Sequence, residues 1–207
     1  GIIYEHIEPQ LAVKAVPSAL DFSLKNLSGL YNENEEHAKR VAQLSLSMFE
    51  QLRQLHKLPN SYARIVKAAG MLHDIGLKIR YYDHHRHTFY MMLNCNLYGF
   101  NHHDRLMAAF IAEFHRKEEP KKDYIKYADI LSGEDIEIIN KMGVLLRIAE
   151  SFDRCMSGVV TNVSCDILGD SVIVKTNATM DATLEIKDAL TSSTIFKKAY
   201  GKNLVIL

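Results

Sequence analysis

The sequence predicts a mainly helical bundle followed by a small α/β subdomain. From residue 18 to about 157, apolar residues recur at steps of three and four, the spacing that places them on one face of an α-helix. After Gly158 the pattern changes to the alternation of apolar and polar residues that is typical of strands. We therefore expect a helical domain over residues 1–157, with 1–17 as a lead-in linker, and a small α/β subdomain over 158–207.

Residues that cap helix N-termini open most of the expected helices. Their side-chain oxygens accept hydrogen bonds from amides of the first turn. These residues are Ser18, Asn34, Asn60 or Ser61, Asn101 and Ser132. The first helix is expected to end at Gly29 and the third at Gly76, and a further helix is expected over 81–94. The charged segment 118–131 contains Pro120 and is expected to form a loop.

The C-terminal part predicts strands and one helix. A hairpin is expected from residues 159–167 and 171–176 around a Leu168-Gly169-Asp170 turn. We expect a further strand over 179–187, a helix over 188–200 and a last strand over 204–207.

Composition excludes several classes of function. Lys and Arg together number 25 and so do Asp and Glu, which argues against strong non-specific binding to nucleic acid or membranes. No apolar run approaches the roughly 20 residues of a membrane span, and the first residues do not resemble a secretory signal. The three cysteines have no metal-binding spacing and suit a reducing compartment. These features predict a cytoplasmic protein.

The most informative motif is the string His73-Asp74-Ile75-Gly76 at the end of an expected helix. Where the helix loosens, a neighbouring imidazole and carboxylate can both turn toward one ion. His37 and Asp153 stand on the inward-facing stripes of two other expected helices. A buried carboxylate is costly unless it is paired or bound to metal. We therefore predict that these four residues bind a divalent metal: Mn, Fe, Co, Zn or Mg.

Other interpretations of these residues remain open. His37 alone could be an ordinary core histidine, and Asp153 alone could form a salt bridge with Arg147 or Arg154. The coincidence of all four residues favours metal binding.

A second group of histidines lies in two strings, His84-His85-Arg86-His87 and His115-Arg116-Lys117. His87 and His115 are candidate ligands of a second ion, with Asp74 as the bridge between the two ions. Arg86, Arg116 and Lys117 are candidates for binding phosphate, so that with Asp74 they form the predicted catalytic set. The alternative is that His85 and His87 are solvated loop residues and that the cations interact with a helix dipole.

These residues resemble the HD superfamily of metal-dependent phosphohydrolases, whose pattern is a His, a His-Asp pair and a late Asp. More closely, the chain is similar to the C-terminal half of the exopolyphosphatase/guanosine pentaphosphatase family. The similar strings are Gly1-Ile-Ile-Tyr-Glu5, Ala69 to Gly76, His85 to Thr88, Gly99 to Asn101, Phe114 to Lys117 and Tyr200 to Leu204.

The resemblance implies an HD-domain-like helical bundle with a small α/β tail. It implies an actin-like ATPase-type domain pair upstream, a homodimer, and a basic passage for a polyanion. Some family members have lost part of the HD ligand set, whereas this chain keeps it. Many active HD enzymes have a lysine directly after the HDIG string, where this chain has Leu77, and Lys78 follows.

Two functions are consistent with these observations. The first is metal-dependent hydrolysis of a phosphoanhydride or phosphoester, with polyphosphate or a nucleotide as the substrate. The second is a regulatory, dimerising and polyphosphate-binding module whose metal is structural. No membrane partner and no specific nucleic acid is expected.

Overall fold

The computed structural model describes residues 18–116 and 124–207, and it confirms the mainly helical fold class. The lead-in 1–17, Lys117 and the part of the expected loop up to residue 123 lie outside the described residues. The described residues up to Phe152 form α2 (Ala19–Tyr31), α3 (Glu35–Gln51), α4 (Arg53–His56), η1 (Asn60–Tyr62), α5 (Ala63–Leu72), η2 (Ile75–Lys78), α6 (His84–Asn94), α7 (His102–Glu113), η3 (Tyr124–Tyr127) and α8 (Gly133–Phe152).

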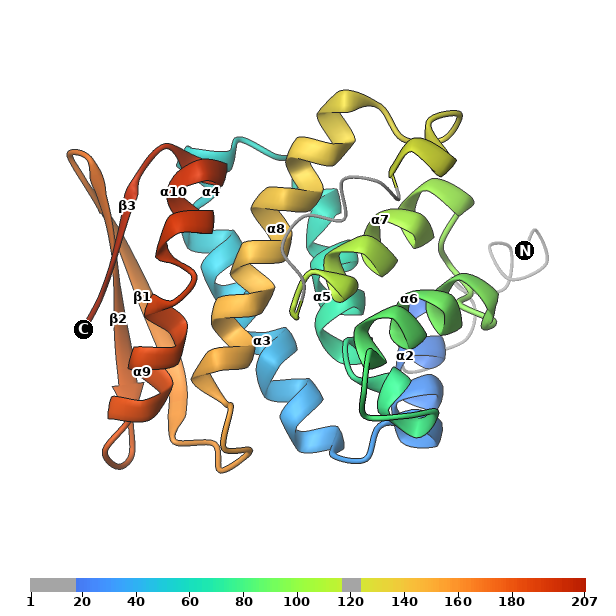
Figure 1. The fold of residues 1–207 in the computed structure, drawn as a ribbon, viewed down its shortest axis with the longest axis horizontal. Helices are drawn as coiled ribbons and strands as arrows, with labels where there is room; N and C mark the ends of the chain where they lie inside the picture. The colour runs from blue at the N-terminus through green and yellow to red at the C-terminus, as the bar shows by residue number, and fades with distance from the viewer. Residues whose placement is uncertain (1–17, 117–123) are drawn as a thin grey trace, which may run out of the picture.

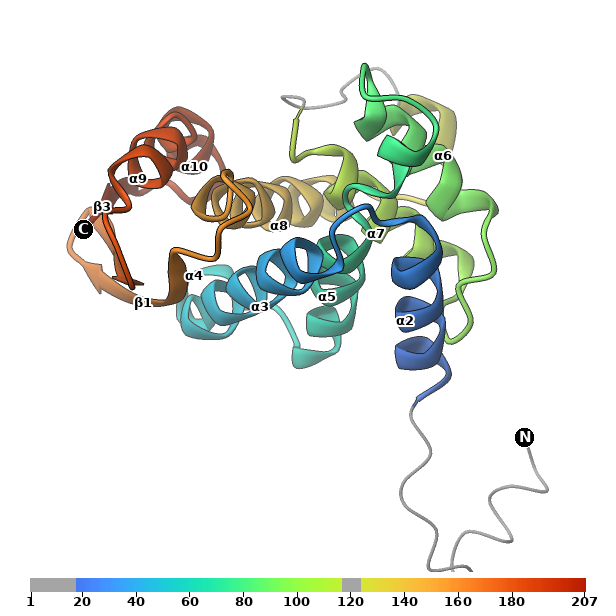
Figure 2. The ribbon, with the colours of Figure 1, turned by 90° about the horizontal axis from the view of Figure 1, so that it is seen from below.

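Helices α3, α5, α7 and α8 form the centre of the bundle. Helix α3 packs against α5 and α8, and α7 packs against α5, α6 and α8 (Figures 1 and 2). Their facing sides are completely buried and carry Val41, Leu72, Phe110 and Leu146 among others. The candidate ligands extend from these central helices and from the turns at their ends.

Four of the expected capping residues, Ser18, Asn34, Asn101 and Ser132, open helices as the sequence predicts. The cap expected at Asn60 or Ser61 is wrong, because these residues form η1 and α5 begins at Ala63 without a side-chain cap. Asn34 accepts a hydrogen bond from the amide of His37, and Asn101 accepts one from the amide of Asp104. Ser132 forms a capping box with Asp135 at the start of α8. The cap at Asn34 fixes the first turn of α3, where His37 lies. No helix in the described ranges 18–116 and 124–207 combines the length and apolar character that a bilayer crossing needs.

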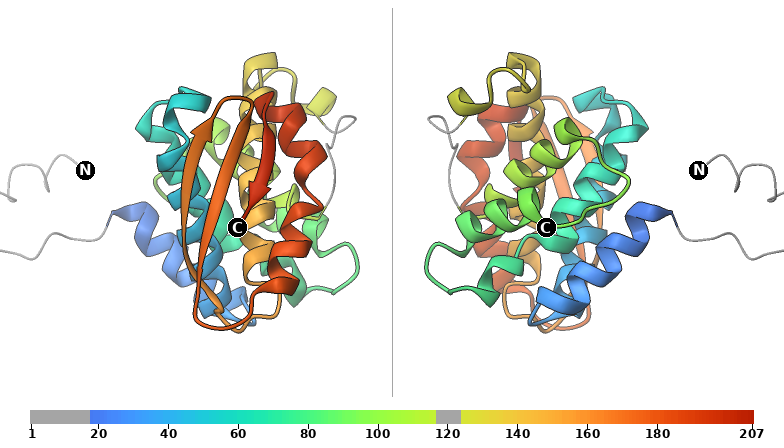
Figure 3. Two further views of the ribbon diagram at one scale, coloured as in Figure 1. Left: turned by 90° about the vertical axis from the view of Figure 1, so that its left-hand side faces the viewer. Right: turned by 90° about the vertical axis from the view of Figure 1, so that its right-hand side faces the viewer.

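The C-terminal part is a three-stranded sheet with two helices. Strands β1 (Val160–Leu168) and β2 (Ser171–Ala178) form the expected antiparallel hairpin, and β3 (Asn203–Ile206) lies parallel to β2 (Figure 3, left). Strand β1 packs against α3.

The strand expected over 179–187 is wrong, because this segment leads into a helix, α9 (Thr183–Leu190). A second helix, α10 (Ser193–Tyr200), follows it, and both pack against α8. Ala182 and Ala189 are seven positions apart, a spacing that places both on one face of a helix, and both side chains are buried. Burial of this face explains why the segment forms a helix and not the expected strand.

The outer edge of β1 is paired with a side chain. The amide nitrogen of Gln51 donates to the carbonyl of Val163 at 2.9 Å, and its oxygen accepts from the amide of Cys165 at 2.8 Å. Gln51 therefore bonds to β1 in the way that a neighbouring strand would.

Candidate metal centre

The string His73-Asp74 lies in the turn that connects α5 to η2. His73 is the C-cap of α5, and Asp74 has left the helical conformation, with φ −109° and ψ 5°. Because the helix ends here, the two side chains both turn into the bundle, and both residues are buried. This is the arrangement that the sequence predicts for an adjacent histidine and aspartate that share one site.

A glycine brings α5 close to α3. A Cβ atom added to Gly70 would overlap the backbone of Ala42 in α3, so only glycine permits this approach of the two helices. The approach places His73 beside His37, and their Nε2 atoms lie 3.3 Å apart.

A threonine attaches the start of α6 to the same turn. The hydroxyl of Thr88 donates to the carbonyl of His73 at 2.8 Å and accepts from the amide of Gly76 at 3.0 Å. The first turn of α6, which carries His84, is thereby held next to Asp74.

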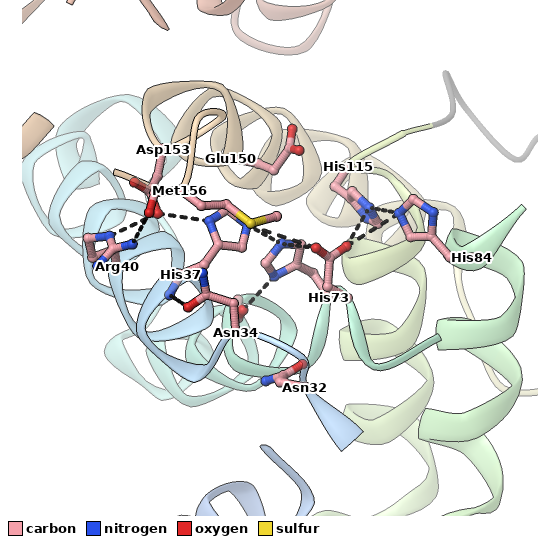
Figure 4. A network of polar contacts seen from close by, with 12 residues as sticks. Asn32, Asn34, His37, Arg40, His73, His84, His115, Glu150, Asp153 and Met156 are labelled. Carbon is pink, nitrogen blue, oxygen red and sulfur yellow. Dashed lines mark hydrogen bonds and ion pairs between the residues drawn. The ribbon is translucent and has the colours of Figure 1, made fainter. Parts of the chain in front are cut away.

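Two groups of potential metal ligands share Asp74. In the first, Oδ2 of Asp74 lies 3.9 Å from Nε2 of His37 and 3.6 Å from Nε2 of His73. In the second, Oδ1 of Asp74 lies 3.3 Å from Nε2 of both His84 and His115. Figure 4 shows His37 on one side of His73 and His84 on the other.

The outer nitrogens of three of these histidines bond to backbone carbonyls. Nδ1 donates to the carbonyl three residues earlier in His73 (2.8 Å), His84 (2.8 Å) and His115 (2.6 Å). Nδ1 of His37 instead donates to the carboxylate of Asp153 at 2.8 Å. Because these oxygens can only accept, the proton of each neutral imidazole is on Nδ1, and the lone pair of Nε2 faces Asp74.

The inward lone pairs need a positive partner. Nε2 of His84 and Nε2 of His115 are 3.0 Å apart, a distance at which two lone pairs repel each other unless a proton or a metal ion lies near them. Oδ1 of Asp74 is buried and has no hydrogen-bond partner among the described residues. Four imidazole nitrogens around one shared carboxylate suit Mn, Fe, Co or Zn, so these residues fit a divalent metal.

The pKa shifts describe the same environment. Burial alone would raise the pKa of Asp74, but the surrounding imidazoles, with His73 first among them, lower it well below its usual value. Burial lowers the pKa of His73 to about 3, so this imidazole is neutral at physiological pH. An ionised carboxylate beside neutral imidazole is the protonation state that metal binding requires.

Asp153 was expected in the ligand set, and the structure places its carboxylate on the far side of His37. Oδ2 also accepts from Nε of Arg40 at 2.8 Å, and Oδ1 accepts from the amide of Gly158 at 2.8 Å. Asp153 is the C-cap of α8, with φ −123° and ψ 30°, and it belongs to neither group of potential ligands. Its position is that of a group that orients a ligand.

His84 takes the place that was expected for His87. His87 is only partly buried and belongs to neither group of potential ligands. The local signal for His84 is that it begins α6 and bonds back to Tyr81, which turns its ring inward.

The predicted phosphate-binding cations lie in different places. Arg116 adjoins His115 and forms an ion pair with the buried Glu150 at 3.4 Å. Arg86 is exposed on α6, and Lys117 lies outside the described residues.

Comparisons with known proteins identify the family to which this chain belongs. Residues 21–195 match the family model described as Ppx/GppA phosphatase, domain III. The chain is 30% identical over 117 residues to the guanosine-5'-triphosphate,3'-diphosphate pyrophosphatase of Aeromonas salmonicida (strain A449), covering 56% of this chain and 23% of that protein. It is 29% identical over 133 residues to the protein of the same name from Aeromonas hydrophila subsp. hydrophila, covering 63% of this chain and 26% of the relative.

The chain thus spans about a quarter of the length of these curated relatives. The family match, by contrast, covers most of this chain and includes His37, Asp74, His84, His115 and Asp153. The chain therefore belongs to the Ppx/GppA phosphatase family, as its domain III.

Proposed function

We propose that this domain binds one or two divalent metal ions at Asp74 and hydrolyses a phosphoanhydride or phosphoester, with polyphosphate or a nucleotide as the substrate class. The observation that carries the proposal is the convergence of four Nε2 atoms on the Asp74 carboxylate, with each Nδ1 bonded to an acceptor. Such pre-oriented imidazoles are typical of metal ligands.

The residues around the centre have separate roles in this proposal. Asp74 bridges the two groups, and Asp153 holds the imidazole of His37 in the tautomer that presents Nε2. Arg116 lies beside the second group and would neutralise charge on a phosphoryl oxygen. A bound divalent ion supplies Lewis acidity at the phosphoryl group and lowers the pKa of water.

The relatives' name supports the reaction class, because a pyrophosphatase cleaves a phosphoanhydride. Since the chain spans about a quarter of those proteins, further domains exist in the relatives. Upstream ATPase-type domains, a homodimer and cytoplasmic localisation are part of the same proposal for this chain's parent protein.

The test measures metal content and hydrolysis on the same samples. Wild type and Asp74→Asn are incubated with Mn, Co, Zn or Mg, desalted, and analysed for bound metal and for phosphate release from pyrophosphate, polyphosphate and nucleotides. We expect wild type to hold metal and release phosphate, and Asp74→Asn to do neither.

His56→Gln is the matched control. His56 is a buried histidine whose two nitrogens both bond to backbone, to Phe49 and Leu58, away from the centre. This variant is expected to keep both metal and activity. Hydrolysis that survives Asp74→Asn would contradict the catalytic proposal.

The second candidate function is a regulatory module with a structural metal. It is favoured by burial, because His73 is completely buried and only 9% of Asp74 is exposed. It predicts bound metal, no phosphate release from any of these substrates, and a lower Tm after chelation with EDTA. An unchanged Tm after complete metal removal would contradict it.

A further inference from the structure

Two adjacent, exposed tyrosines lie in the turn that leads into α6. Tyr81 is 66% exposed and Tyr82 is 70% exposed. Their ring centroids are 5.7 Å apart, with an angle of 84° between the planes. At this angle the rings meet edge to face, so a planar ring that stacks on one of them would meet the edge of the other.

The pair adjoins the candidate metal centre through His84. The ring of Tyr81 lies 5.9 Å from the ring of His84, and the Tyr81 carbonyl accepts the hydrogen bond from Nδ1 that orients this imidazole. The other nitrogen of His84 lies 3.3 Å from Asp74. One imidazole thus separates the aromatic pair from the carboxylate that the two ligand groups share.

One cation lies directly on the pair, and a second adjoins the candidate metal centre. The guanidinium of Arg80 lies over the ring of Tyr82, 5.5 Å from its centroid. Arg116 directly follows His115, whose Nε2 lies 3.0 Å from Nε2 of His84. A ligand with a flat ring and a nearby anionic group would match both the aromatic faces and these cations.

We propose that Tyr81 and Tyr82 form the ring-binding subsite of the centre and select nucleoside phosphates over inorganic polyphosphate. This inference rests on the proposed function, since it assumes that a phosphate group is bound at Asp74. The base stacks on one ring of the pair and meets the edge of the other, and the sugar spans His84 so that the phosphate reaches the centre. Inorganic polyphosphate has no ring and gains nothing from this subsite.

The experiment uses two ligands that differ only in the base, guanosine 5′-monophosphate and ribose 5-phosphate. Their values of kcat/KM are compared in the metal-loaded wild type, in Tyr81→Ala/Tyr82→Ala and in Tyr90→Ala. Tyr90 is 64% exposed and lies further along α6, so it controls for the loss of a surface tyrosine. Calorimetric titration gives the Kd of each ligand on the same samples.

We expect wild type to have a higher kcat/KM for the nucleotide than for ribose 5-phosphate. In the double variant this ratio should fall about tenfold, because stacking of one base typically contributes about that much or more to binding. Tyr90→Ala should keep the preference. An equal preference in wild type and the double variant would overturn the proposal, and so would equal Kd values for the two ligands in wild type.

The calorimetry separates this proposal from the proposed function. If neither ligand is hydrolysed but the nucleotide binds more tightly than ribose 5-phosphate in a Tyr81- and Tyr82-dependent way, the subsite stands and the catalytic proposal fails. If both ligands are hydrolysed with no dependence on the two tyrosines, the catalytic proposal stands and the subsite fails.

Discussion

The carboxylate of Asp153 accepts the Nδ1 proton of His37 at 2.8 Å, across 116 positions of the chain. His73, His84 and His115 each use a backbone carbonyl three residues away for the same purpose. His37 alone depends on a charged side chain from another helix, and this carboxylate is itself bonded to Arg40 and to the amide of Gly158. The orientation of His37 therefore depends on the end of α8.

Replacing Asp153 should weaken metal binding without abolishing it. In Asp153→Asn we expect the metal Kd to rise about 10- to 100-fold, the usual effect of losing a group that orients a ligand. Asp166→Asn, an exposed aspartate paired with Lys175, is the charge-matched control and should leave the Kd unchanged. Competition with a chromogenic chelator measures the Kd. A loss as complete as that of Asp74→Asn would show that Asp153 is itself a ligand.

The number of bound ions should depend on His115. In His115→Gln the second group loses a ligand while His37, His73 and Asp74 remain, so a protein that binds two equivalents of metal should keep one. Elemental analysis after desalting counts the ions. His56→Gln should keep the wild-type count, and an unchanged count in His115→Gln would place the second ion elsewhere.

Gly76 should tolerate no side chain. A Cβ atom there would overlap the carbonyl of His84 and the amide of Thr88, both of them backbone groups. Gly76→Ala should lower the free energy of unfolding by about 2 kcal/mol or more, as overpacking does, and weaken metal binding by displacing α6. Gly133→Ala is the control, because nothing lies near its Cβ position and the change should be neutral or slightly stabilising. Urea unfolding measures both variants, and equal stability would contradict the close approach.

Acid should destabilise the metal-free protein. The pKa of His73 is about 3 in the fold and near the ordinary 6.5 when unfolded, so between these values the unfolded chain binds the extra proton. The free energy of unfolding should therefore fall as the pH is lowered from 7 toward 4. His85, whose pKa burial lowers to about 4, acts in the same direction. His84 opposes them, because its raised pKa gives stability below 6.5 that is lost as the pH rises.

The measurement is Tm in EDTA from pH 7 to pH 4.5. His73→Gln should show a shallower decrease than wild type, because it removes the buried group with the lowered pKa. A Tm that stays constant or rises on acidification would show that His73 is accessible to protons in the folded state.

Helical spacing and capping residues predict most of this fold and part of the site. His37 follows its cap Asn34 by three positions and lies on a stripe with Val41, so its inward direction follows from the period of the helix. His73 and Asp74 could be assigned to the site because a glycine ends the segment. These predictions need only information that is local in the sequence.

The remaining assignments depend on turns and on distant contacts. At a helix start, periodicity cannot show which of His84, His85 and His87 points into the bundle. The hydrogen bond from His84 to the Tyr81 carbonyl orients the imidazole of His84 inward. Asp153 is buried as predicted, but its direction depends on Arg40 and Gly158, which only the tertiary structure brings together. The segment 179–187 was misassigned because its short apolar pattern also fits a strand.

The pairing of Gln51 with β1 bears on how copies of this protein can associate. A strand at the edge of a sheet offers free amides and carbonyls to any other chain, and such edges promote fibril formation. At Val163 and Cys165 these groups are already bonded to a side chain of α3. A second molecule that extended the sheet at β1 would first have to displace Gln51, so this side chain protects the hairpin against edge-to-edge aggregation.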